Sequence, residues 1–572
     1  MENNDIADIF DDIADLLDIQ DANAFRIRSY RSAAQTVRGL SERLEDIGKD
    51  KKKLRDIPNI GKSTSDKIVE ILTTGTCTRL EELREEIPED LTTLMEIPQL
   101  GPRKVAELYR ELNIKSLDEL RKACEDHKVR DLEGMGEKTE ENILHGIATL
   151  EQTAGRTLLK AAAEQVEALG RHLDRIDTVE KWQVAGSFRR GQETVGDLDI
   201  LVHATDREKA TSRIVEHRSI KEVASRGSER VTVHLTSGLQ VDFRYFAPKS
   251  FGSALMYFTG SKAHNIKLRK RAQSHNWKLN EYGLLEDDTR LAGETEEGIF
   301  EKLGLPWIPP ELREDRGEID AAEKGDLPTL VSRDDLRGDL HCHSTASDGN
   351  KTVEEMARAA VDLGYDYIAI TDHSKAVTVA NGLDEKRLRD HAAHIHQVDD
   401  SMDTITVLAG IEVDILEDGT LDLAEDALKE LDWVTASVHS HFSMPQKDMT
   451  ERILKAVRSG LIHSLGHPMG RMLGRREPIQ FDTEEVFNAC RENHVALEIN
   501  SQPERLDLPD NYCKMAKDMG VTFTVCTDAH NDTNLQLIHY GILVARRGWL
   551  TKDDIVNTWT LKDIRDWVKN KE

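Results

Sequence analysis

The sequence predicts a chain of several domains, helical at its N-terminus, α+β in its middle and α/β at its C-terminus. Its 572 residues exceed what one hydrophobic core organises, so three or four domains are expected. Glycine turns alternate with helical patterns in the first 150 residues, and the middle part contains a strand that alternates acidic and apolar residues. After Asp339, short apolar runs ending in polar clusters alternate with helical segments, as in parallel β/α structures.

The chain is strongly acidic, with a formal net charge of −29. This charge argues against a protein that nucleic acid wraps through bulk electrostatics. Residues 181–275, however, carry 17 Lys and Arg against 9 Asp and Glu. An acidic protein with a basic middle segment fits local binding of nucleic acid.

The six cysteines are scattered and form no C-x-x-C motif, so we expect reduced thiols. No apolar run approaches the roughly 18 residues that span a bilayer, and the N-terminus lacks the features of a signal peptide. We therefore expect a soluble, cytoplasmic protein.

Three turns of the form apolar-x-x-apolar-Gly, each followed by a helical pattern, occur at residues 57–62, 97–102 and 132–137, with their glycines at Gly61, Gly101 and Gly136. Such a turn exposes backbone N–H groups at a helix N-terminus, where a phosphate oxygen binds. One copy is an ordinary turn between helices. Three copies resemble the helix-hairpin-helix motif, which holds DNA backbones without reading sequence.

The middle segment contains Gly186-Ser187-Phe188-Arg189-Arg190-Gly191, followed by a strand in which Asp197 and Asp199 share one face. A second strand carrying Asp242, paired beside the first, completes a cluster of three carboxylates. Such a cluster can hold two Mg²⁺ or Mn²⁺ ions roughly 4 Å apart for displacement at phosphorus. The loop offers donors to a triphosphate from its Gly, Ser and Arg residues. Taken alone, D-x-D is also compatible with a solvated strand edge.

Together these motifs, with Tyr257-Phe258-Thr259-Gly260-Ser261 after them, resemble the nucleotidyltransferase signature of the family X DNA polymerases. The resemblance implies a palm with a mixed sheet and deoxynucleoside triphosphates as substrates. The three carboxylates would be the metal ligands, with Asp242 as general base, and Lys262 departs from the acidic residue of animal members. The implied nucleotide-binding residues are Gly186, Ser187 and Arg190 at the phosphates, Tyr257, Phe258 and Gly260 at the sugar, Asn265 at the base and Arg269 at the template.

The first helical domain resembles the lyase domain of the same enzymes, in which a lysine attacks an abasic sugar. That lysine falls at Lys67, and Tyr30 occupies the family's aromatic position. Phe25, Arg26 and Ser63 replace residues that contact phosphate in animal members. A solvated surface lysine is the alternative interpretation.

From Asp339 onward, His, Asp and Glu residues follow the apolar runs, where a βα barrel carries its functional side chains. His341 and His343 lie two residues apart and form a chelating pair on one strand face. Nine candidate ligands, enough for three metal ions, are His341, His343, Asp348, His373, Glu412, His439, His467, Asp528 and His530. Any one of these histidines taken singly fits a polar residue at a barrel rim.

This set resembles the PHP (polymerase and histidinol phosphatase) family and implies a distorted (β/α)7 barrel. The implied ligands are His341, His343, Glu412 and Asp528 for one ion, Glu412, His439 and His467 for a second, and Asp348, His373 and His530 for a third. Such His-rich ligation suits Zn²⁺ or Mn²⁺. A hydroxide bridging these ions attacks phosphoesters.

Other polar residues of the C-terminal part receive different interpretations. We expect solvated side chains at His391, His394 and His396, and support of neighbouring ligands at His441 and His463. Three arginines are candidates for binding a substrate phosphate: Arg471, Arg475 and Arg505.

The sequence thus predicts a monomeric DNA-repair enzyme acting on gapped or nicked DNA. It fills gaps, as in base excision repair, and uses its PHP domain as a 3′-5′ exonuclease and abasic-site endonuclease. Alternatives are a nuclease that uses the polymerase half as a tether, a non-catalytic scaffold, and a phosphatase of small esters. The expected domains are 1–80 (lyase-like), 81–150 (helix-hairpin-helix), 151–246 (palm), 247–315 (nascent base pair), 316–337 (linker) and 338–572 (PHP).

Overall fold

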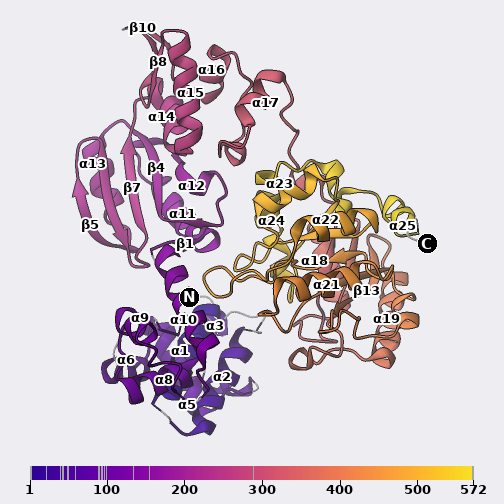
Figure 1. Cartoon of the computed structure of the whole chain (residues 1–572). Coiled ribbons are helices and arrows are strands. Elements are labelled where there is room, and N and C mark those ends of the chain that lie inside the picture. Colours follow the sequence, from indigo (N-terminus) through magenta and orange to yellow (C-terminus); the bar gives the residue numbers. More distant parts are fainter. Residues whose placement is uncertain are drawn as a thin grey trace. The chain divides into compact units, whose positions relative to one another are not determined.

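The structure is a computed structural model of the whole chain (Figure 1). It describes residues 3–20, 22–38, 40, 44–47, 51–57, 59–87, 91, 94, 95, 97, 100–132, 134–153, 155–287 and 289–569. Two compact units are distinguished, Met1–Ala154 with Gly474–Arg476, and Gly155–Leu473 with Glu477–Glu572. Within the described residues, no helix has the length and apolar character that crossing a membrane requires.

The first unit is entirely helical in its described residues. Apolar residues at helical spacing in its first helix, among them Ile6, Phe10 and Ile13, are fully buried in one core that all of these helices share. The helices are α1 Asn3–Ile19, α2 Ala24–Arg38, α3 Leu44–Ile47, α4 Lys51–Asp56, α5 Lys62–Thr74, α6 Thr78–Glu86, α8 Pro102–Leu112, α9 Leu117–Glu125 and α10 Glu137–Thr153.

The glycines of the three repeated turns stand at the starts of helices. Gly61 is the N-cap of α5, Gly101 is the N-cap of α8, and Gly136 directly precedes α10. All three have open space where a Cβ would stand, and none has a positive φ. The fold itself therefore does not require glycine at these turns. Four further residues of these turns lie outside the described part of the chain: Pro58, Pro98, Gln99 and Glu133.

The palm is a five-stranded mixed sheet in the order β2-β4-β7-β6-β5. Strands β4 and β7 are parallel, and every other neighbouring pair is antiparallel. Apolar residues such as Leu198, Ile200 and Phe243 fill its core. Its elements are β1 Thr157–Leu158, α11 Leu159–Leu173, β2 Val179–Val184, α12 Gly186–Arg189, β3 Thr194–Val195, β4 Asp197–Ala204, α13 Arg207–Ile214, β5 Ile220–Arg226, β6 Arg230–Leu235 and β7 Gln240–Tyr245.

The subdomain that follows the palm combines helices with a small antiparallel sheet in the order β10-β9-β8. Its elements are α14 Pro248–Thr259, α15 Lys262–Ser274, β8 Lys278–Asn280, β9 Gly283–Glu286, β10 Thr289–Ala292, α16 Glu296–Lys302 and η1 Pro310–Leu312. Buried Glu296 binds the guanidinium groups of Arg189 and Arg313. This charged cluster joins the palm loop to α16 and to the C-terminal end of the subdomain.

Residues 316–337, which the sequence predicts to be a linker, are instead packed on the folded parts to either side. Ile319, Ala322 and Leu330 lie in the core of this subdomain, and Val331 and Leu336 lie in the core of the C-terminal part. Helix α17 Glu318–Lys324 buries Ile319 and Ala322 in the subdomain core, and η2 Arg333–Asp335 follows it. The side chain of Glu318 accepts hydrogen bonds from the Asp315 and Arg316 backbone and pairs with buried His264. The apolar residues of this charged segment are few but correctly spaced for one helical turn.

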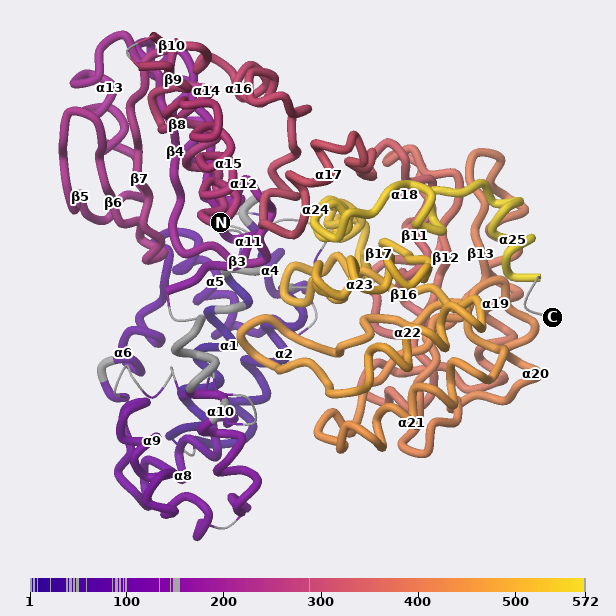
Figure 2. Tube along the Cα trace, turned by 45° about the horizontal axis from the view of Figure 1, so that its top comes forward, coloured from indigo at the N-terminus to yellow at the C-terminus, as the bar shows by residue number. Residues whose placement is uncertain are grey.

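The C-terminal part is a barrel of seven parallel strands in sequential order, drawn as the salmon, orange and yellow part of the tube (Figure 2). A parallel bridge between Cys342 and Ala529 brings its first and last strands together, so the barrel is nearly closed. The strands are β11 Gly338–Cys342, β12 Tyr367–Ile370, β13 Thr406–Asp414, β14 Trp433–Ser437, β15 Ser464–Leu465, β16 Ala496–Asn500 and β17 Phe523–Cys526.

Helices lie outside this barrel. They are α18 Val353–Asp362, η3 Thr378–Ala380, α19 Glu385–Asp400, α20 Glu425–Leu428, α21 Gln446–Val457, α22 Thr483–Glu492, α23 Asp510–Asp518, η4 Asp532–Leu537, α24 Ile538–Arg547, η5 Lys552–Asp554, η6 Val556–Thr558 and α25 Leu561–Lys569. Trp559 and Trp567, at the end of the chain, pack on an apolar cluster that includes strand residue Trp433.

Glu296 makes the palm-subdomain junction sensitive to acid. Burial raises its pKa, but Arg313 and Arg189 outweigh that effect and lower it from 4.5 to about 2. The ionised carboxylate therefore stabilises the fold above pH 4.5, and this stabilisation is lost as the pH falls toward 2. We expect Glu296→Gln to reduce the free energy of unfolding by about 3 kcal/mol near neutral pH.

Urea unfolding followed by tryptophan fluorescence measures this loss, because the Trp307 indole donates to Glu296. The matched control is Glu297→Gln, since that neighbouring side chain is exposed. Equal unfolding midpoints for both variants would contradict the assigned role.

Candidate functional site

Two parallel strands bring the predicted palm carboxylates together. In the β4-β7 register, Asp199 stands directly opposite Asp242, and Asp197 stands two residues earlier on the same face of β4. Asp197 is exposed, Asp199 is half-buried and Asp242 is buried. The carboxylates thus run from solvent into the sheet, as substrate access and a fixed inner ligand require.

Arg244 bridges the two inner carboxylates, a contact that the motifs do not predict. It donates from Nε to Asp199 at 2.7 Å and from an Nη to Asp242 at 2.6 Å. The hydroxyl of Thr232 donates to the other oxygen of Asp242. Burial raises the pKa of Asp199, although Arg244 opposes this. The cluster therefore demands positive charge, which fits carboxylates that bind divalent cations.

The glycine loop lies beside these carboxylates. Gly186 has a φ of 66°, which favours glycine, and a Cβ there would make an ordinary contact at 3.5 Å with an oxygen of Asp199. Ser187 is half-buried in short helix α12. Arg190 donates from Nε to Glu314 at 2.8 Å and from Nη1 to the Thr259 carbonyl at 2.5 Å.

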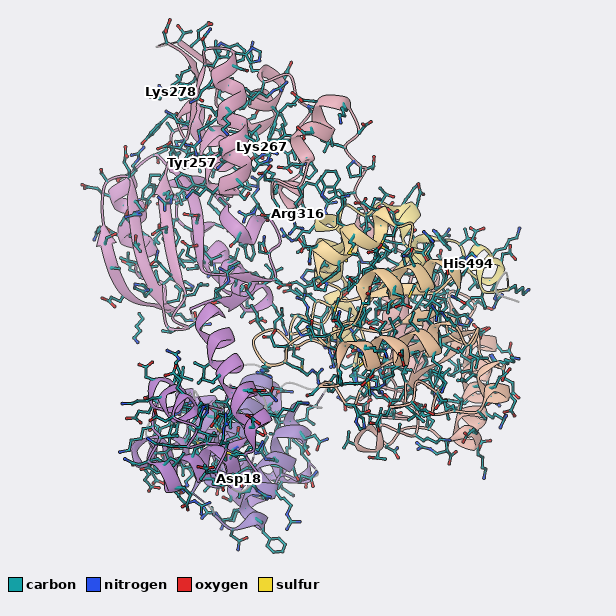
Figure 3. All side chains as sticks on the ribbon, in the orientation of Figure 1. Asp18, Tyr257, Lys267, Lys278, Arg316 and His494 are labelled. Atoms are coloured by element: carbon teal, nitrogen blue, oxygen red, sulfur yellow. The ribbon has the colours of Figure 1, made fainter. Side chains whose placement is uncertain are left out.

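The predicted sugar and base contacts gather where α14 meets α15. Tyr257 and Phe258 form an edge-to-face pair with centroids 5.1 Å apart, and Arg244 lies 4.4 Å above the Phe258 ring (Figure 3 labels Tyr257). Asn265 donates its amide to the Tyr257 carbonyl, and Arg269 lies 5.9 Å from the Tyr257 ring. Gly260, at the C-terminus of α14, has a φ of 69°. Lys262 begins α15 and is exposed.

In the N-terminal unit, Lys67 lies on α5 beside the aromatic residue predicted for it. Its Nζ donates to Ser63 at 3.0 Å and lies 5.7 Å from the Tyr30 ring centroid. Phe25 is exposed, with Arg28 rather than Arg26 above its ring. The lyase role of Lys67 stays a prediction.

The barrel brings its predicted ligands to one end. His341 and Glu412 lie within strands, whereas His343, His439, His467 and Asp528 follow strands β11, β14, β15 and β17 by one or two residues. Three sets of ligand atoms lie within 4.8 Å of one another in the described chain. They are His343, Asp348, His373 and His530; His341, His343 and Asp528; and His373, Glu412 and His439.

Glu412 contacts several imidazoles of this centre. Its Oε1 lies 2.9 Å from Nε2 of His467 and 3.2 Å from Nε2 of His439, and its Oε2 lies 2.8 Å from Nδ1 of His373. The sets differ from those that the resemblance implies, because His343 joins the Asp348 set and His373 also joins the Glu412 set. The nine residues nevertheless form one continuous centre.

Ring nitrogens without partners show that the centre fits cations. Nε2 of His341, Nδ1 of His343 and Nδ1 of His467 are buried and have no hydrogen-bond partner among the described residues. Unpaired buried nitrogens cost free energy unless something binds them. Imidazole and carboxylate donors in sets of three or four suit Zn²⁺ or Mn²⁺.

The charges of these groups oppose one another. Burial, with His530 and His373 beside it, lowers the pKa of His343 to about 4, so this imidazole is neutral. Burial also disfavours charge on His439, but Glu412 and Asp414 outweigh it and raise that pKa to about 10. Glu412 is held ionised: burial would raise its pKa, yet His439, His373 and His341 hold it well below its usual range. Ion binding therefore displaces protons from the histidines.

Carboxylates outside the predicted set orient the ligands. Glu498 of β16 binds Nδ1 of His341 at 2.6 Å, and Asp414 binds Nδ1 of His439 at 3.0 Å. Both fix which ring nitrogen faces the centre. The sequence signal for Glu498 was available, since it is the only charged residue in the apolar run 495–499.

Several expectations outside the ligand set are wrong. His391 is buried and binds Asp372, which also accepts hydrogen bonds from Ser344 and Ser347, so it is not solvated. His463 accepts a hydrogen bond from the Val434 backbone at the start of β14, the strand end away from the ligands. The guanidinium of Arg471 is already paired with Glu193 and the Leu506 carbonyl, so it is not a free phosphate-binding group.

Comparison with known protein families finds matching models along most of the chain. Family models match a helix-hairpin-helix domain at residues 1–77, a SAM-like helix-hairpin-helix tandem at 89–149, a DNA polymerase beta palm at 132–248, a DNA polymerase beta thumb at 254–314 and a PHP domain at 339–502. Both the palm and the barrel are thus recognised independently of the site geometry.

Individual relatives match either the whole chain or one part of it. The Arabidopsis thaliana DNA polymerase lambda is 26% identical over 54% of the chain and 62% of its own length. A probable phosphatase of Thermoanaerobacter sp. is 31% identical over 41% of the chain and 95% of its own length. The Bacillus subtilis DNA polymerase/3′-5′ exonuclease PolX is 36% identical over the full length of both chains. The chain therefore belongs to the PolX family, the family X DNA polymerases that carry a PHP domain.

Proposed function

We propose that this protein fills short gaps in DNA by two-metal nucleotidyl transfer in the palm and trims 3′ ends by phosphoester hydrolysis in the barrel. The observation that carries the proposal is the presence of two separate ligand-rich centres on one chain, one of carboxylates and one mainly of imidazoles. Each centre lies at strand ends of a fold matched by its own family model.

In the palm, Asp197, Asp199 and Asp242 would hold Mg²⁺ or Mn²⁺. When bound, these ions supply charge stabilisation for the attacking and leaving oxygens. Asp242, held by Thr232, accepts the proton of the primer 3′ hydroxyl, whose oxygen then bonds to the α-phosphorus as pyrophosphate leaves. Ser187 and Arg190 bind the departing phosphates, and Tyr257 and Phe258 orient the sugar.

The barrel would hold up to three Zn²⁺ or Mn²⁺ ions, which supply a hydroxide nucleophile when bound. Glu412 fixes the surrounding imidazoles, while Glu498 and Asp414 hold His341 and His439 in the required tautomers. A terminal phosphodiester is cleaved when water adds at phosphorus and the 3′ oxygen leaves. The abasic-site incision predicted from the sequence would use the same centre.

Gapped or nicked DNA is the proposed partner, bound by a monomer through the helix N-termini at Gly61, Gly101 and Gly136. Open space above these glycines supports close approach by a DNA backbone. The proposed domain limits are those expected from the sequence, except that residues 316–330 are assigned to the subdomain before them and residues 331–337 to the barrel.

Single substitutions separate the two centres. We expect Asp197→Ala to abolish extension of a 5′-labelled primer in a one-nucleotide gap while trimming in Mn²⁺ without nucleotides continues. His341→Ala should abolish trimming while extension of the primer continues. Glu208→Ala and His394→Ala, at exposed positions, serve as controls. Loss of both activities from either single change would contradict two separate sites, and trimming by the wild type without any extension would favour the tethered nuclease.

Metal content tests the barrel centre directly. We expect purified wild-type protein loaded with Zn²⁺ or Mn²⁺ to retain up to three ions per chain by elemental analysis. His343→Ala should lose at least one, because His343 belongs to two of the three ligand sets. An unchanged ion count in this variant would show that the ions bind elsewhere.

The turn glycines test the DNA-binding proposal. Gly101→Ala meets no atom within 4 Å and has an ordinary φ, so we expect stability to change by less than about 1 kcal/mol. Binding to gapped DNA should nevertheless weaken about fivefold, because a methyl group obstructs a phosphate at the helix N-terminus. Fluorescence anisotropy at fixed salt measures the affinity.

The control variant for this test is Gly75→Ala, whose φ of 84° makes it a strained substitution outside the turns. It should lower stability and leave the affinity of the folded protein unchanged. Unaltered DNA binding by Gly101→Ala would overturn the role of its turn.

A further inference from the structure

We propose that Arg547, at the end of barrel helix α24, is a positioning residue for nucleotide addition, acting on the triphosphate-binding residue Arg190 both through Glu314 and by a direct hydrogen bond to the Arg190 carbonyl. The inference rests on the proposed polymerase function. It assigns to the PHP part of the chain a role in the palm besides its own chemistry. All three residues belong to the second compact unit.

Glu314 is the acceptor that joins the two arginines. Its Oε1 accepts from Nε of Arg190 at 2.8 Å and from Nη1 of Arg547 at 3.0 Å. The amide of Gln192 donates to the same oxygen at 2.6 Å. The side chains of Arg190 and Glu314 are each 13% exposed and that of Arg547 is 4% exposed, so water competes little for these contacts.

Arg547 also holds the loop backbone. Its Nη1 donates to the carbonyl oxygen of Arg190 at 2.8 Å. Arg190 is thereby fixed at its carbonyl by Arg547, at Nε by Glu314, and at Nη1 by the Thr259 carbonyl. Among the described residues, Nη2 of Arg190 has no protein acceptor, so it is left for a phosphate oxygen.

Packing fastens the same loop to α24. Gly191 follows Arg190 with a φ of 66°, and a Cβ there would lie 3.3 Å from the Leu543 side chain of α24. Phe188 of the loop packs against both the palm core and the barrel core. The loop that binds triphosphate is therefore built partly on the barrel.

The charges explain why a second arginine is needed. Glu314 and Arg190 alone would form a neutral pair, and a buried neutral pair attracts a triphosphate weakly. Arg547 adds positive charge, and Asp510 binds both Arg547 and Arg316 (Figure 3 labels Arg316). Together, Arg190, Arg316 and Arg547 carry three positive charges against the two negative charges of Glu314 and Asp510. Although burial raises the pKa of Glu314, Arg190 and Arg547 lower it overall, so its carboxylate is ionised.

Two consequences follow if Arg547 is lost. Arg190 keeps its partner Glu314 but loses the bond that fixes its carbonyl, so the guanidinium is less well oriented. The cluster also loses its excess positive charge. Both changes weaken nucleotide binding rather than the chemical step, because neither involves the palm carboxylates.

Steady-state gap filling with the full-length protein tests this inference. We expect Arg547→Met to raise the KM for deoxynucleotide about tenfold with kcat changed less than about threefold. Arg547→Lys, which keeps the charge, should recover part of the loss. Trimming of the same labelled primer without nucleotides should be unchanged.

Arg546→Met is the matched control. Arg546 is the preceding residue of α24 and pairs with Glu311 and the Val331 carbonyl, but it makes no bond to the triphosphate loop. A general loosening of the barrel against the polymerase part would raise KM equally in both variants. Only the proposed role of Arg547 raises KM in Arg547→Met and leaves it unchanged in Arg546→Met.

A double-mutant cycle with Glu314→Gln identifies the route. Because Arg547 acts through Glu314 as well as through the Arg190 carbonyl, the effect of Arg547→Met should shrink from about tenfold to about threefold in the Glu314→Gln background. Should Arg547→Met fail to fold, judged by its thermal midpoint, Arg547→Gln takes its place. An unchanged KM in a folded variant, or equal losses of extension and trimming, would overturn the inference. A wild-type protein that does not extend primers would instead overturn the proposed polymerase function.

Discussion

Buried carboxylates need cations, and this requirement shapes both centres of the protein. In the palm, Asp199 and Asp242 face each other across parallel strands, where two adjacent negative charges repel unless something compensates them. Arg244 supplies that compensation from the same strand as Asp242. In the barrel, the imidazoles around Glu412 supply it. Divalent ions would have to replace or displace these internal cations, so each centre binds ions in competition with its own positive groups.

The two centres meet this requirement with different chemistry. Arg244 remains charged at any accessible pH, so it cannot make room for an ion by releasing a proton and must move aside. The histidines of the barrel can lose protons and become ligands without moving. The barrel is thus preorganised for its ions, whereas the palm requires rearrangement of one side chain.

The sequence predicted the parts of the protein that follow from strand periodicity and strand ends. Asp197 and Asp199 were predictable because alternate residues of a strand share one face, and Asp242 because its strand pairs beside β4. The candidate ligands of the barrel were predictable because they lie at or just after the ends of apolar runs. Side chains that depend on pairing between distant segments were not predictable. Nothing in the sequence distinguishes Arg244, Glu314 and Arg547 from other charged residues. In the fold, Arg244 contacts Asp199 and Arg547 contacts Glu314. Helix α17 was missed because only three apolar residues, two of them alanines, mark it among the charged ones.

Synthesis and trimming act on the same end of a DNA strand, so the protein must favour one over the other for each 3′ terminus it holds. On the proposed function, a bound nucleotide supplies this choice, since only the palm uses it. The loop that receives its triphosphate includes Gly191, packed on Leu543, and Phe188, which reaches the barrel core. Because α24 also packs on strands β16 and β17, which position Glu498 and Asp528, one helix borders both centres. Within the second compact unit, helix α24 therefore contacts both the loop proposed to receive the triphosphate and two strands of the barrel proposed to carry out hydrolysis.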